Sequence, residues 1–165
     1  MRTRLFGTAV FAAVMATSVA TTAEAQLKLL EPERAFAFSV QALDEKTVEA
    51  RFAIASGYYL YREKLQFSVE PATLLSAPAL PSGKVKDDEF FGKVETYRGK
   101  LAVRLSLNGI PPGAKVTVKA ESQGCADAGV CYPPQVQNVT VALPMPGVRP
   151  SPAVAATSPK KPWFN

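Results

Sequence analysis

The sequence has 165 residues, with 19 lysines and arginines against 14 aspartates and glutamates, a net charge of +5, and no histidine. Without histidine the chain cannot use Ser-His or Cys-His catalysis or C-x-x-C-H haem attachment, and its two cysteines fall short of most zinc sites. The basic residues are scattered, and no basic stripe with interleaved aromatic residues occurs, which argues against nucleic-acid binding.

Residues 1–25 have the pattern of a secretory signal peptide. Arg2 and Arg4 form the charged start, an apolar stretch follows, and Ala23-Glu24-Ala25 fits the A-x-A cleavage rule. We therefore expect the mature chain to begin at Gln26, with 17 basic residues minus 13 acidic ones and a net charge of +4. No later run approaches the roughly 18 apolar residues of a membrane span, so we expect an exported protein without stable membrane insertion. Export places the cysteines in an oxidising space, where a disulfide can form and persist.

From residue 35 onward the hydrophobic pattern predicts short β-strands. Apolar and polar residues alternate over 35–40, 47–55, 65–69, 101–107 and 115–122, and apolar residues recur at Val139, Val141 and Leu143. Glycine, proline, asparagine and aspartate separate these runs, and no convincing ten-residue helix pattern occurs. The sequence therefore predicts one all-β domain, an antiparallel sandwich. An antibody-type core is not expected, because there is no long-range cysteine pair and Trp163 is the only tryptophan.

The end of the chain differs in composition from the rest. Pro144 to Asn165 includes six prolines among 22 residues, with alanine, serine and lysine between them. Such a composition is typical of extended chain. We expect the folded domain to span residues 26–145 and residues 146–165 to form a poorly ordered tail.

The two cysteines, Cys125 and Cys131, lie in a stretch that contains Gly124 and Gly129 and is closed by Pro133-Pro134. A bridge between them closes a ring of about seven residues, which the chain-entropy model values at roughly 2 kcal/mol. The glycines allow a strained ring, and strained or exposed disulfides are the labile ones. The spacing is not a recognised redox signature. From these residues alone, a structural clip and a working redox couple both stay open.

Two other segments have unusual composition. Gly57 to Arg62 contains three tyrosines, and buried phenols need hydrogen-bond partners. Asp87 to Gly92 sets three carboxylates before two phenylalanines and a glycine that could act as a hinge. Taken singly, each has an ordinary interpretation: tyrosines at a sheet edge, and an acidic turn followed by core phenylalanines.

Together, three motifs resemble a known family. Tyr58-Tyr59-Leu60-Tyr61-Arg62, Asp88-Glu89-Phe90-Phe91-Gly92-Lys93 and the stretch from Gln123 to Pro134 are similar to the N-terminal periplasmic domain of the bacterial thiol:disulfide interchange protein DsbD. The resemblance runs from about Leu29 to Leu143, in the right order and spacing. It implies an all-β, immunoglobulin-like antiparallel β-sandwich with protein-disulfide reductase activity. That chemistry is thiolate attack on a disulfide sulfur and uses no metal or organic cofactor.

The resemblance also implies roles for particular residues. Cys125 and Cys131 would cycle between dithiol and disulfide, with Cys131 forming mixed disulfides with partners and Cys125 resolving them. Asp88 to Gly92 would form a cap loop over the disulfide, with Phe90 as the shielding ring. Carboxylates near a thiol oppose the thiolate, so the acidic residues of this loop are expected to raise the cysteine pKa values. The site residues implied in this way are Cys125, Cys131, Asp88, Glu89, Phe90, Phe91, Gly92, Tyr59 and Tyr61.

Partners follow from the same resemblance. A thioredoxin-like domain or a membrane thiol reductant would be the electron donor, and periplasmic disulfide isomerases or thioredoxin-like proteins would be the acceptors. The family protein continues into a membrane-embedded domain and a C-terminal thioredoxin-like domain, so we expect this chain, a monomer, to receive electrons from separate proteins. The alternative is a non-catalytic, immunoglobulin-like secreted binding module with a static structural disulfide. A secreted inhibitor or adhesin would also carry an unreactive disulfide.

Overall fold

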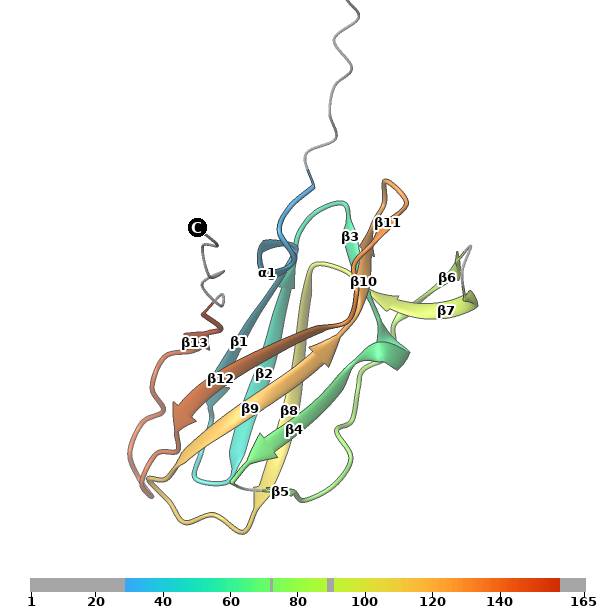
Figure 1. Ribbon diagram of the computed structural model, residues 1–165. Coiled ribbons are helices and arrows are strands. Elements are labelled where there is room, and N and C mark those ends of the chain that lie inside the picture. Colours follow the sequence, from blue (N-terminus) through green and yellow to red (C-terminus); the bar gives the residue numbers. More distant parts are fainter. Residues whose placement is uncertain (1–28, 72, 89–90, 158–165) are drawn as a thin grey trace, which may run out of the picture.

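The computed structural model describes residues 29–71, 73–88 and 91–157, and β-strands dominate these ranges (Figure 1). The only helical elements described are α1 (Pro32–Ala35) and the single 3-10 turn η1 (Arg62–Lys64). None of the helices in these ranges has the length and apolar character needed to cross a membrane. The expected signal peptide, residues 1–25, lies outside the described residues.

Two antiparallel sheets pack face to face to form a sandwich (Figure 1). The first has the strand order β13-β1-β2-β8-β5 and consists of β13 (Val154–Ala155), β1 (Phe36–Ala42), β2 (Thr47–Ile54), β8 (Lys100–Asn108) and β5 (Thr73–Leu74). The second has the order β12-β9-β4 and consists of β12 (Gln135–Ala142), β9 (Lys115–Ser122) and β4 (Gln66–Glu70). Every strand pair described in these sheets is antiparallel, as the short alternating runs predict.

The core lies between the two sheets, because each strand turns its apolar residues inward. Along β8 every second side chain is buried, and β9 alternates in the same way. In the first sheet the rings of Phe38 and Phe52 have centroids 4.9 Å apart, and Val118 of β9 is fully buried in the same core. Burying one such large side chain stabilises the fold by about 1.5–3 kcal/mol. The predicted all-β, immunoglobulin-like sandwich is confirmed.

A third sheet extends from one end of the sandwich (Figure 1). Its order is β11-β10-β3-β7-β6, and it consists of β11 (Val130–Cys131), β10 (Gly124–Ala126), β3 (Tyr58–Tyr61), β7 (Gly92–Tyr97) and β6 (Lys84–Asp88). Two hairpins in this sheet contain the cysteine stretch and the acidic segment. The first is formed by β10 and β11 and carries both cysteines. The second is formed by β6 and β7, and Asp88 lies at the end of β6.

The segment after residue 145 also departs from expectation. β13 pairs with the edge strand β1, with Val154 opposite Val40 and Ala155 opposite Ser39. The amide of Ala156 donates to the carbonyl oxygen of Phe38 at 2.9 Å. An open edge strand offers unpaired backbone groups, which explains why a proline-rich segment finds partners there. The expectation of a tail without regular structure therefore does not hold for these residues, while residues 158–165 lie outside the described part of the chain.

Candidate functional site

The two cysteines form a disulfide across the β10–β11 hairpin, with their Cα atoms 4.0 Å apart. They are direct partners in the strand register. The amide of Tyr132 donates to the carbonyl oxygen of Gly124 at 2.9 Å, so the cysteines occupy the adjacent non-hydrogen-bonded pair, where facing side chains are closest. Cys125 is fully buried, whereas Cys131 is partly exposed at the sheet edge. Only one of the two sulfur-bearing residues therefore faces solvent.

Gly124 lets β10 pass close to its neighbours. A Cβ atom at this position would lie 2.3 Å from the carbonyl oxygen of Tyr59 and 2.7 Å from the ring of Phe36. Backbone and aromatic ring approach from two directions, so no side chain fits. The glycine before Cys125 is thus required by packing between β10 and β3.

The strand β3 separates the main core from the disulfide. All four of its residues are buried, so it has no solvent face. Tyr58 and Leu60 point into the main core, while Tyr59 and Tyr61 form a second cluster with Cys125. Successive side chains of a strand point to opposite faces, so the tyrosine-rich segment contributes alternate residues to the two clusters.

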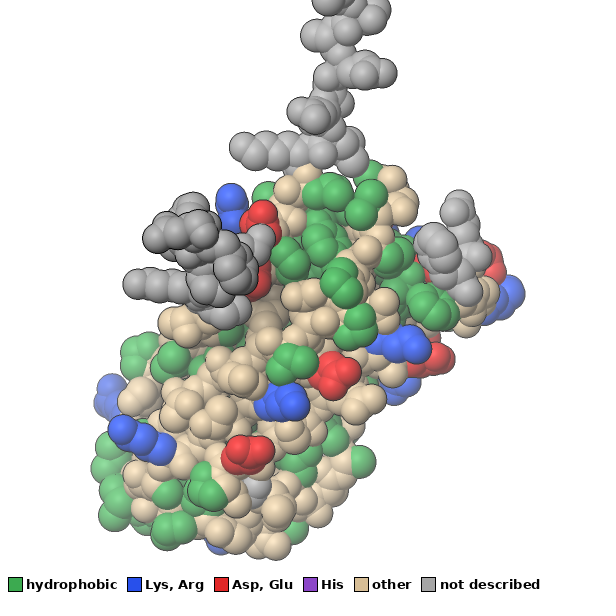
Figure 2. Space-filling model, in the orientation of Figure 1, with side chains coloured by type: hydrophobic (Ala, Val, Ile, Leu, Met, Phe, Trp, Pro, Cys, Tyr) green, Lys and Arg blue, Asp and Glu red, His purple; other side chains and the backbone are tan. Residues whose placement is uncertain are grey.

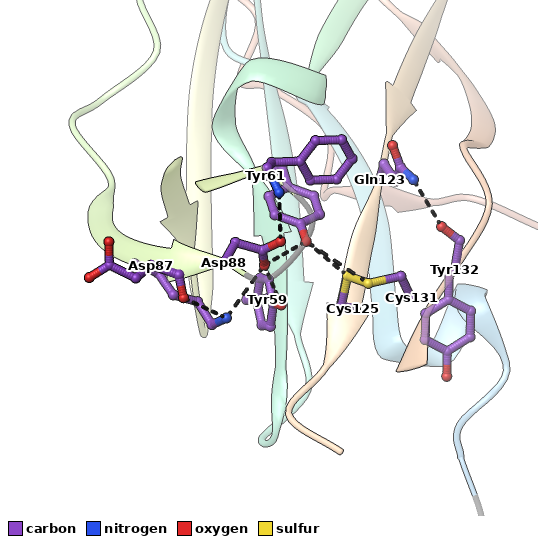
Figure 3. The surroundings of a disulfide bond; sticks show 10 residues. Tyr59, Tyr61, Asp87, Asp88, Gln123, Cys125, Cys131 and Tyr132 are labelled. Carbon is purple, nitrogen blue, oxygen red and sulfur yellow. Dashed lines mark hydrogen bonds and ion pairs between the residues drawn. A yellow bond between two sulfur atoms is a disulfide. The ribbon is translucent and has the colours of Figure 1, made fainter. Parts of the chain in front are cut away.

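Asp88 anchors the hydroxyl groups of this second cluster (Figure 3). Its Oδ2 accepts hydrogen bonds from the hydroxyl of Tyr61 at 2.8 Å and from that of Tyr59 at 3.0 Å. The ammonium of Lys86 lies 3.4 Å from the same oxygen, and the amide of Phe91 donates to Oδ1. The side chain of Asp88 is 2% exposed. A buried carboxylate requires such donors, and here they come from β3 and from its own hairpin.

The hydroxyl of Tyr61 connects Asp88 with the disulfide (Figure 3). It lies 3.2 Å from Sγ of Cys125 and 3.9 Å from Sγ of Cys131. The single hydroxyl proton goes to the carboxylate, the stronger acceptor, so the oxygen lone pairs face the sulfurs. Burial, followed by the hydrogen bonds to Tyr59 and Asp88, raises the pKa of Tyr61 above its ordinary value. The phenol therefore stays protonated at neutral pH.

A second tyrosine pair fixes the chain around the hairpin exit. Tyr132, next to Cys131, donates its hydroxyl to the carbonyl oxygen of Leu30 at 2.6 Å. The amide of Leu30 in turn donates to the hydroxyl of Tyr58 at 2.8 Å. Burial, followed by the neighbouring Tyr58, raises the pKa of Tyr132 to about 12. The segment before α1 is thereby tied to the residue that follows the exposed cysteine.

Raising the pH from 10 to 12 is expected to lower the melting temperature. Phenols of the unfolded chain ionise near 10.0, whereas the folded protein keeps the pKa of Tyr132 at about 12 and that of Tyr61 above its ordinary value. The unfolded state thus binds fewer protons in this window, and stability falls by on the order of 2 kcal/mol; below pH 10 both states are protonated and these groups have no effect. Thermal unfolding followed with tyrosinate absorbance measures this. A constant melting temperature up to pH 12 would contradict it, and Tyr132→Phe should reduce the slope.

The expected cap loop lies between β6 and β7, where Asp88 pairs with Gly92. Phe91 is 48% exposed, and its ring packs edge-to-face with that of Tyr61, with centroids 5.3 Å apart. Gly92 has a φ of +70°, a conformation that favours glycine, and its role as a hinge stays a prediction. Glu89 and Phe90 lie outside the described residues, so the shielding ring stays a prediction.

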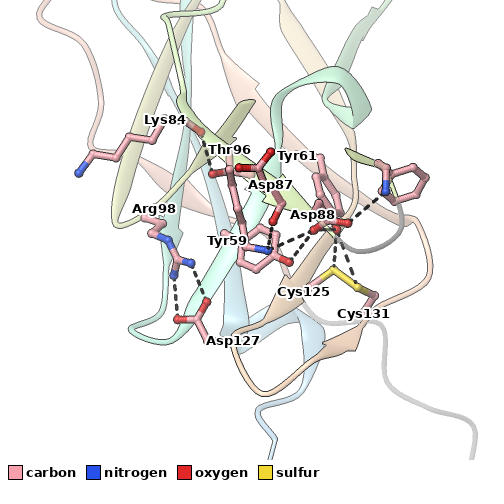
Figure 4. Close-up of polar contacts among 12 residues, drawn as sticks. Tyr59, Tyr61, Lys84, Asp87, Asp88, Thr96, Arg98, Cys125, Asp127 and Cys131 are labelled. Atoms are coloured by element: carbon pink, nitrogen blue, oxygen red, sulfur yellow. Dashed lines mark hydrogen bonds and ion pairs between the residues drawn. A yellow bond between two sulfur atoms is a disulfide. The ribbon is translucent and has the colours of Figure 1, made fainter. Parts of the chain in front are cut away.

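Charged residues from outside the acidic segment, Lys86, Arg98 and Asp127, lie near this segment and Cys131 (Figure 4). A cavity of about 150 Å³ beside Cys131 is lined by Lys86, Asp87, Asp88 and Asp127 among others. Arg98 forms a two-pronged ion pair with Asp127, with nitrogen–oxygen distances of 2.9 and 2.6 Å. Arg98 and Asp127 are 29 residues apart in sequence, so no local sequence pattern indicates that they form a pair. In the described part of the chain, no group of three or more cysteine or acidic side chains is arranged to hold a metal ion.

Comparison with known proteins places these features in context. The sequence profile described as "Thiol:disulfide interchange protein DsbD, N-terminal" matches residues 26–143. The thiol:disulfide interchange protein DsbD of Ralstonia nicotianae is 43% identical over 160 residues, which cover 93% of this chain and 26% of that protein. The Escherichia coli protein of the same name is 40% identical over 107 residues, covering 65% of this chain and 18% of that protein. The chain thus spans about a quarter or less of these relatives.

Solved structures resemble this fold as well. The crystal structure of the Neisseria meningitidis DsbD n-terminal domain in the reduced form superposes with a TM-score of 0.65 and 32% identity, covering 78% of this chain and 96% of that one. A structure of the complex between the DsbD N-terminal and PilB N-terminal domains of the same organism gives a TM-score of 0.60 and 33% identity, covering 81% and 94% of the respective chains.

Proposed function

The chain belongs to the family of the N-terminal domain of the thiol:disulfide interchange protein DsbD, and from this premise we propose that it is a periplasmic thiol–disulfide exchange module. In this role the Cys125–Cys131 pair accepts two electrons from one thiol partner and passes them to the disulfide of another. The observation that carries the proposal is the asymmetry of the pair: a buried Cys125 in contact with Tyr61, and a Cys131 that partners can reach.

Reduction of the pair proceeds in two exchanges. A donor thiolate attacks Sγ of Cys131, the S–S bond breaks, and Cys125 leaves as a thiolate beside the hydroxyl of Tyr61. The second thiol of the donor then attacks the mixed disulfide and releases Cys131. The donor dithiol has become a disulfide, and two electrons and two protons have moved to this chain.

Transfer to an acceptor reverses these steps. The Cys131 thiolate attacks the acceptor disulfide and forms a mixed disulfide, which Cys125 resolves. Cys125 must lose its proton to do so, and the contacts from Cys125 to Tyr61 and from Tyr61 to Asp88, at 3.2 and 2.8 Å, provide a path for that proton. We assign Asp88 the role of proton acceptor through Tyr61, with Tyr59 holding the carboxylate in place.

The hairpin that ends at Asp88 and restarts at Gly92 is proposed to act as the cap. Phe91 already packs on Tyr61 from this hairpin, which supports a cover over the buried sulfur. Glu89 and Phe90 complete the cap in this proposal, with Phe90 as the ring that excludes small oxidants. Docking of a partner then moves the hairpin aside and admits its thiolate to Cys131.

The partners are proposed to be proteins with thioredoxin-like folds. As donor we propose a thioredoxin-like domain or a membrane thiol reductant, and as acceptors disulfide isomerases or thioredoxin-like proteins of the periplasm. The family match begins at Gln26, where signal cleavage is predicted, which supports export. Figure 2 shows hydrophobic side chains gathered around the end of the molecule that carries the β10–β11 hairpin, where Val130 is 40% exposed. An apolar surface beside Cys131 suits transient docking.

The reduction potential of the Cys125–Cys131 pair tests this proposal. The mature protein is equilibrated against glutathione buffers of known ratio, and the dithiol fraction is measured by thiol alkylation. A potential of roughly −180 to −270 mV is expected, the range of exchange proteins. A potential below about −300 mV would mark a structural bridge and favour a binding module with a static disulfide.

A further inference from the structure

Apart from the disulfide, few interactions hold the two strands of the β10–β11 hairpin together. β10 has three residues and β11 two, and β11 lies at the edge of its sheet. The register contains only two pairs, of which one is the cysteine pair itself. When the S–S bond opens, this short pairing and the hydrogen bond from the amide of Tyr132 to the carbonyl oxygen of Gly124 are left to keep Cys131 opposite Cys125.

The turn of the hairpin has a separate attachment. Both guanidinium nitrogens Nη1 and Nη2 of Arg98 donate to the two carboxylate oxygens of Asp127, at 2.9 and 2.6 Å (Figure 4). Nη1 also lies 3.3 Å from the carbonyl oxygen of Tyr58, and the guanidinium carbon lies 5.0 Å from the ring centre of Tyr59. Arg98 therefore connects the turn to β3, the strand that carries Tyr61. The amide of Asp127 adds a bond to the carbonyl oxygen of Gly57.

Charge and shape make this attachment specific. The rigid fork of arginine matches a carboxylate through two parallel bonds, which a lysine cannot reproduce. The hydrogen bonds from Arg98 come first among the causes that lower the pKa of Asp127, so the carboxylate stays ionised at neutral pH. The two side chains are 41% and 49% exposed, and solvent screens part of their attraction.

We propose that Arg98 is a positioning residue which, through Asp127, holds the β10–β11 turn against β3 so that Cys131 stays opposite Cys125 after the disulfide is reduced. This inference rests on the proposed function, because only a pair that cycles through the dithiol needs its geometry kept in that state. Arg98 does not act on the sulfurs; it limits the positions that the Cys131 thiol can take.

The consequence concerns the equilibrium between the two redox forms. Reduction by glutathione consumes two glutathione thiols and yields the protein dithiol and one glutathione disulfide. Without the Arg98–Asp127 pair the dithiol hairpin gains open conformations, which favours the reduced state. The equilibrium constant for forming the Cys125–Cys131 disulfide should then fall about threefold, the scale of an exposed ion pair. This corresponds to a potential about 14 mV less negative, because a tenfold change corresponds to 29.6 mV.

The experiment compares equilibrium constants for Arg98→Gln, Asp127→Asn and the double variant in glutathione buffers. Each single variant should show the threefold fall, and the double variant should show the same fall as either single one, because both remove one interaction. Arg98→Lys should behave like Arg98→Gln, since it lacks the fork. The matched control is Arg51→Gln, which removes a residue of equal side-chain exposure, 41%, paired with Glu49 on β2. In Arg51→Gln the equilibrium constant for forming the Cys125–Cys131 disulfide should equal that of the wild type.

Two results would overturn the proposal: constants that equal the wild-type value in both single variants, or falls that add in the double variant. Asp127→Asn is nearly isosteric, so it keeps the test valid if Arg98→Gln does not fold. The outcome is separable from that of the proposed function, because glutathione requires no partner protein. A wild-type potential below about −300 mV would reject the exchange role, whatever the variants do.

Discussion

Cys131→Ala is expected to abolish electron transfer while the sandwich stays folded. Cys131 is the partly exposed member of the pair, so its loss leaves only a fully buried Cys125 that no donor thiolate can reach. Loss of a bridge that closes such a short ring should lower the free energy of unfolding by about 2 kcal/mol. Single-turnover exchange with a reduced thioredoxin-fold protein measures the first effect, and denaturant unfolding measures the second.

Cys125→Ala is the matched control for this experiment. It removes the same bridge and keeps the reactive sulfur, so the Cys131 thiolate should attack the disulfide of an oxidised thioredoxin-fold protein and form a mixed disulfide that this chain cannot resolve. Mass spectrometry of the trapped complex detects it. A complex trapped through Cys125 in Cys131→Ala, with none trapped through Cys131 in Cys125→Ala, would show that the roles of the two cysteines are reversed.

Gly124→Ala adds a single methyl group and should lower the free energy of unfolding by about 3 kcal/mol. Its new Cβ would stand 2.3 Å from the carbonyl oxygen of Tyr59, and backbone cannot swing away as a flexible side chain can. β10 has to move off β3, which also shifts Cys125 relative to Tyr61. Denaturant unfolding measures the loss, and the reduction potential reports whether the cysteines have moved.

Gly109→Ala separates these two effects. Gly109 has a φ of +73° and open space around its Cβ position, so alanine there costs about 1 kcal/mol through backbone strain alone. Its turn follows β8 and does not touch the disulfide, so the reduction potential should stay at the wild-type value. If Gly124→Ala were no more destabilising than this control, close packing at Gly124 would not be the reason for glycine there.

The sandwich could be predicted where strands have one buried face. β2, β8 and β9 alternate strictly, because their outer side chains meet water and their inner ones meet the core. β3 shows no alternation, since it is buried on both sides. β13 was missed for a different reason. Its proline-rich surroundings indicate extended chain, and only the free edge of β1 turns that chain into a strand.

The site was only partly predictable for related reasons. The cysteine, tyrosine and acidic motifs are local, and the structure brings Asp88, Tyr59 and Tyr61 together as one cluster around Cys125. The burial of Asp88 had no signal in its sequence neighbourhood, because an acidic run ordinarily lies in water. Arg98 is one basic residue among many, and its contact with Asp127 in the β10–β11 hairpin is visible only in the folded structure.

The double-sided burial of β3 has a consequence for how variants of this protein can fail. A shift of its pairing by one residue would turn Tyr58 and Leu60 toward the sulfurs and push Tyr59 and Tyr61 into the main core. Both the apolar core and the cluster around the disulfide would be lost in the same event. Molecules misaligned at this strand would then not accumulate as well-folded but inactive protein, so the proposed exchange activity and correct folding at β3 should be gained or lost together.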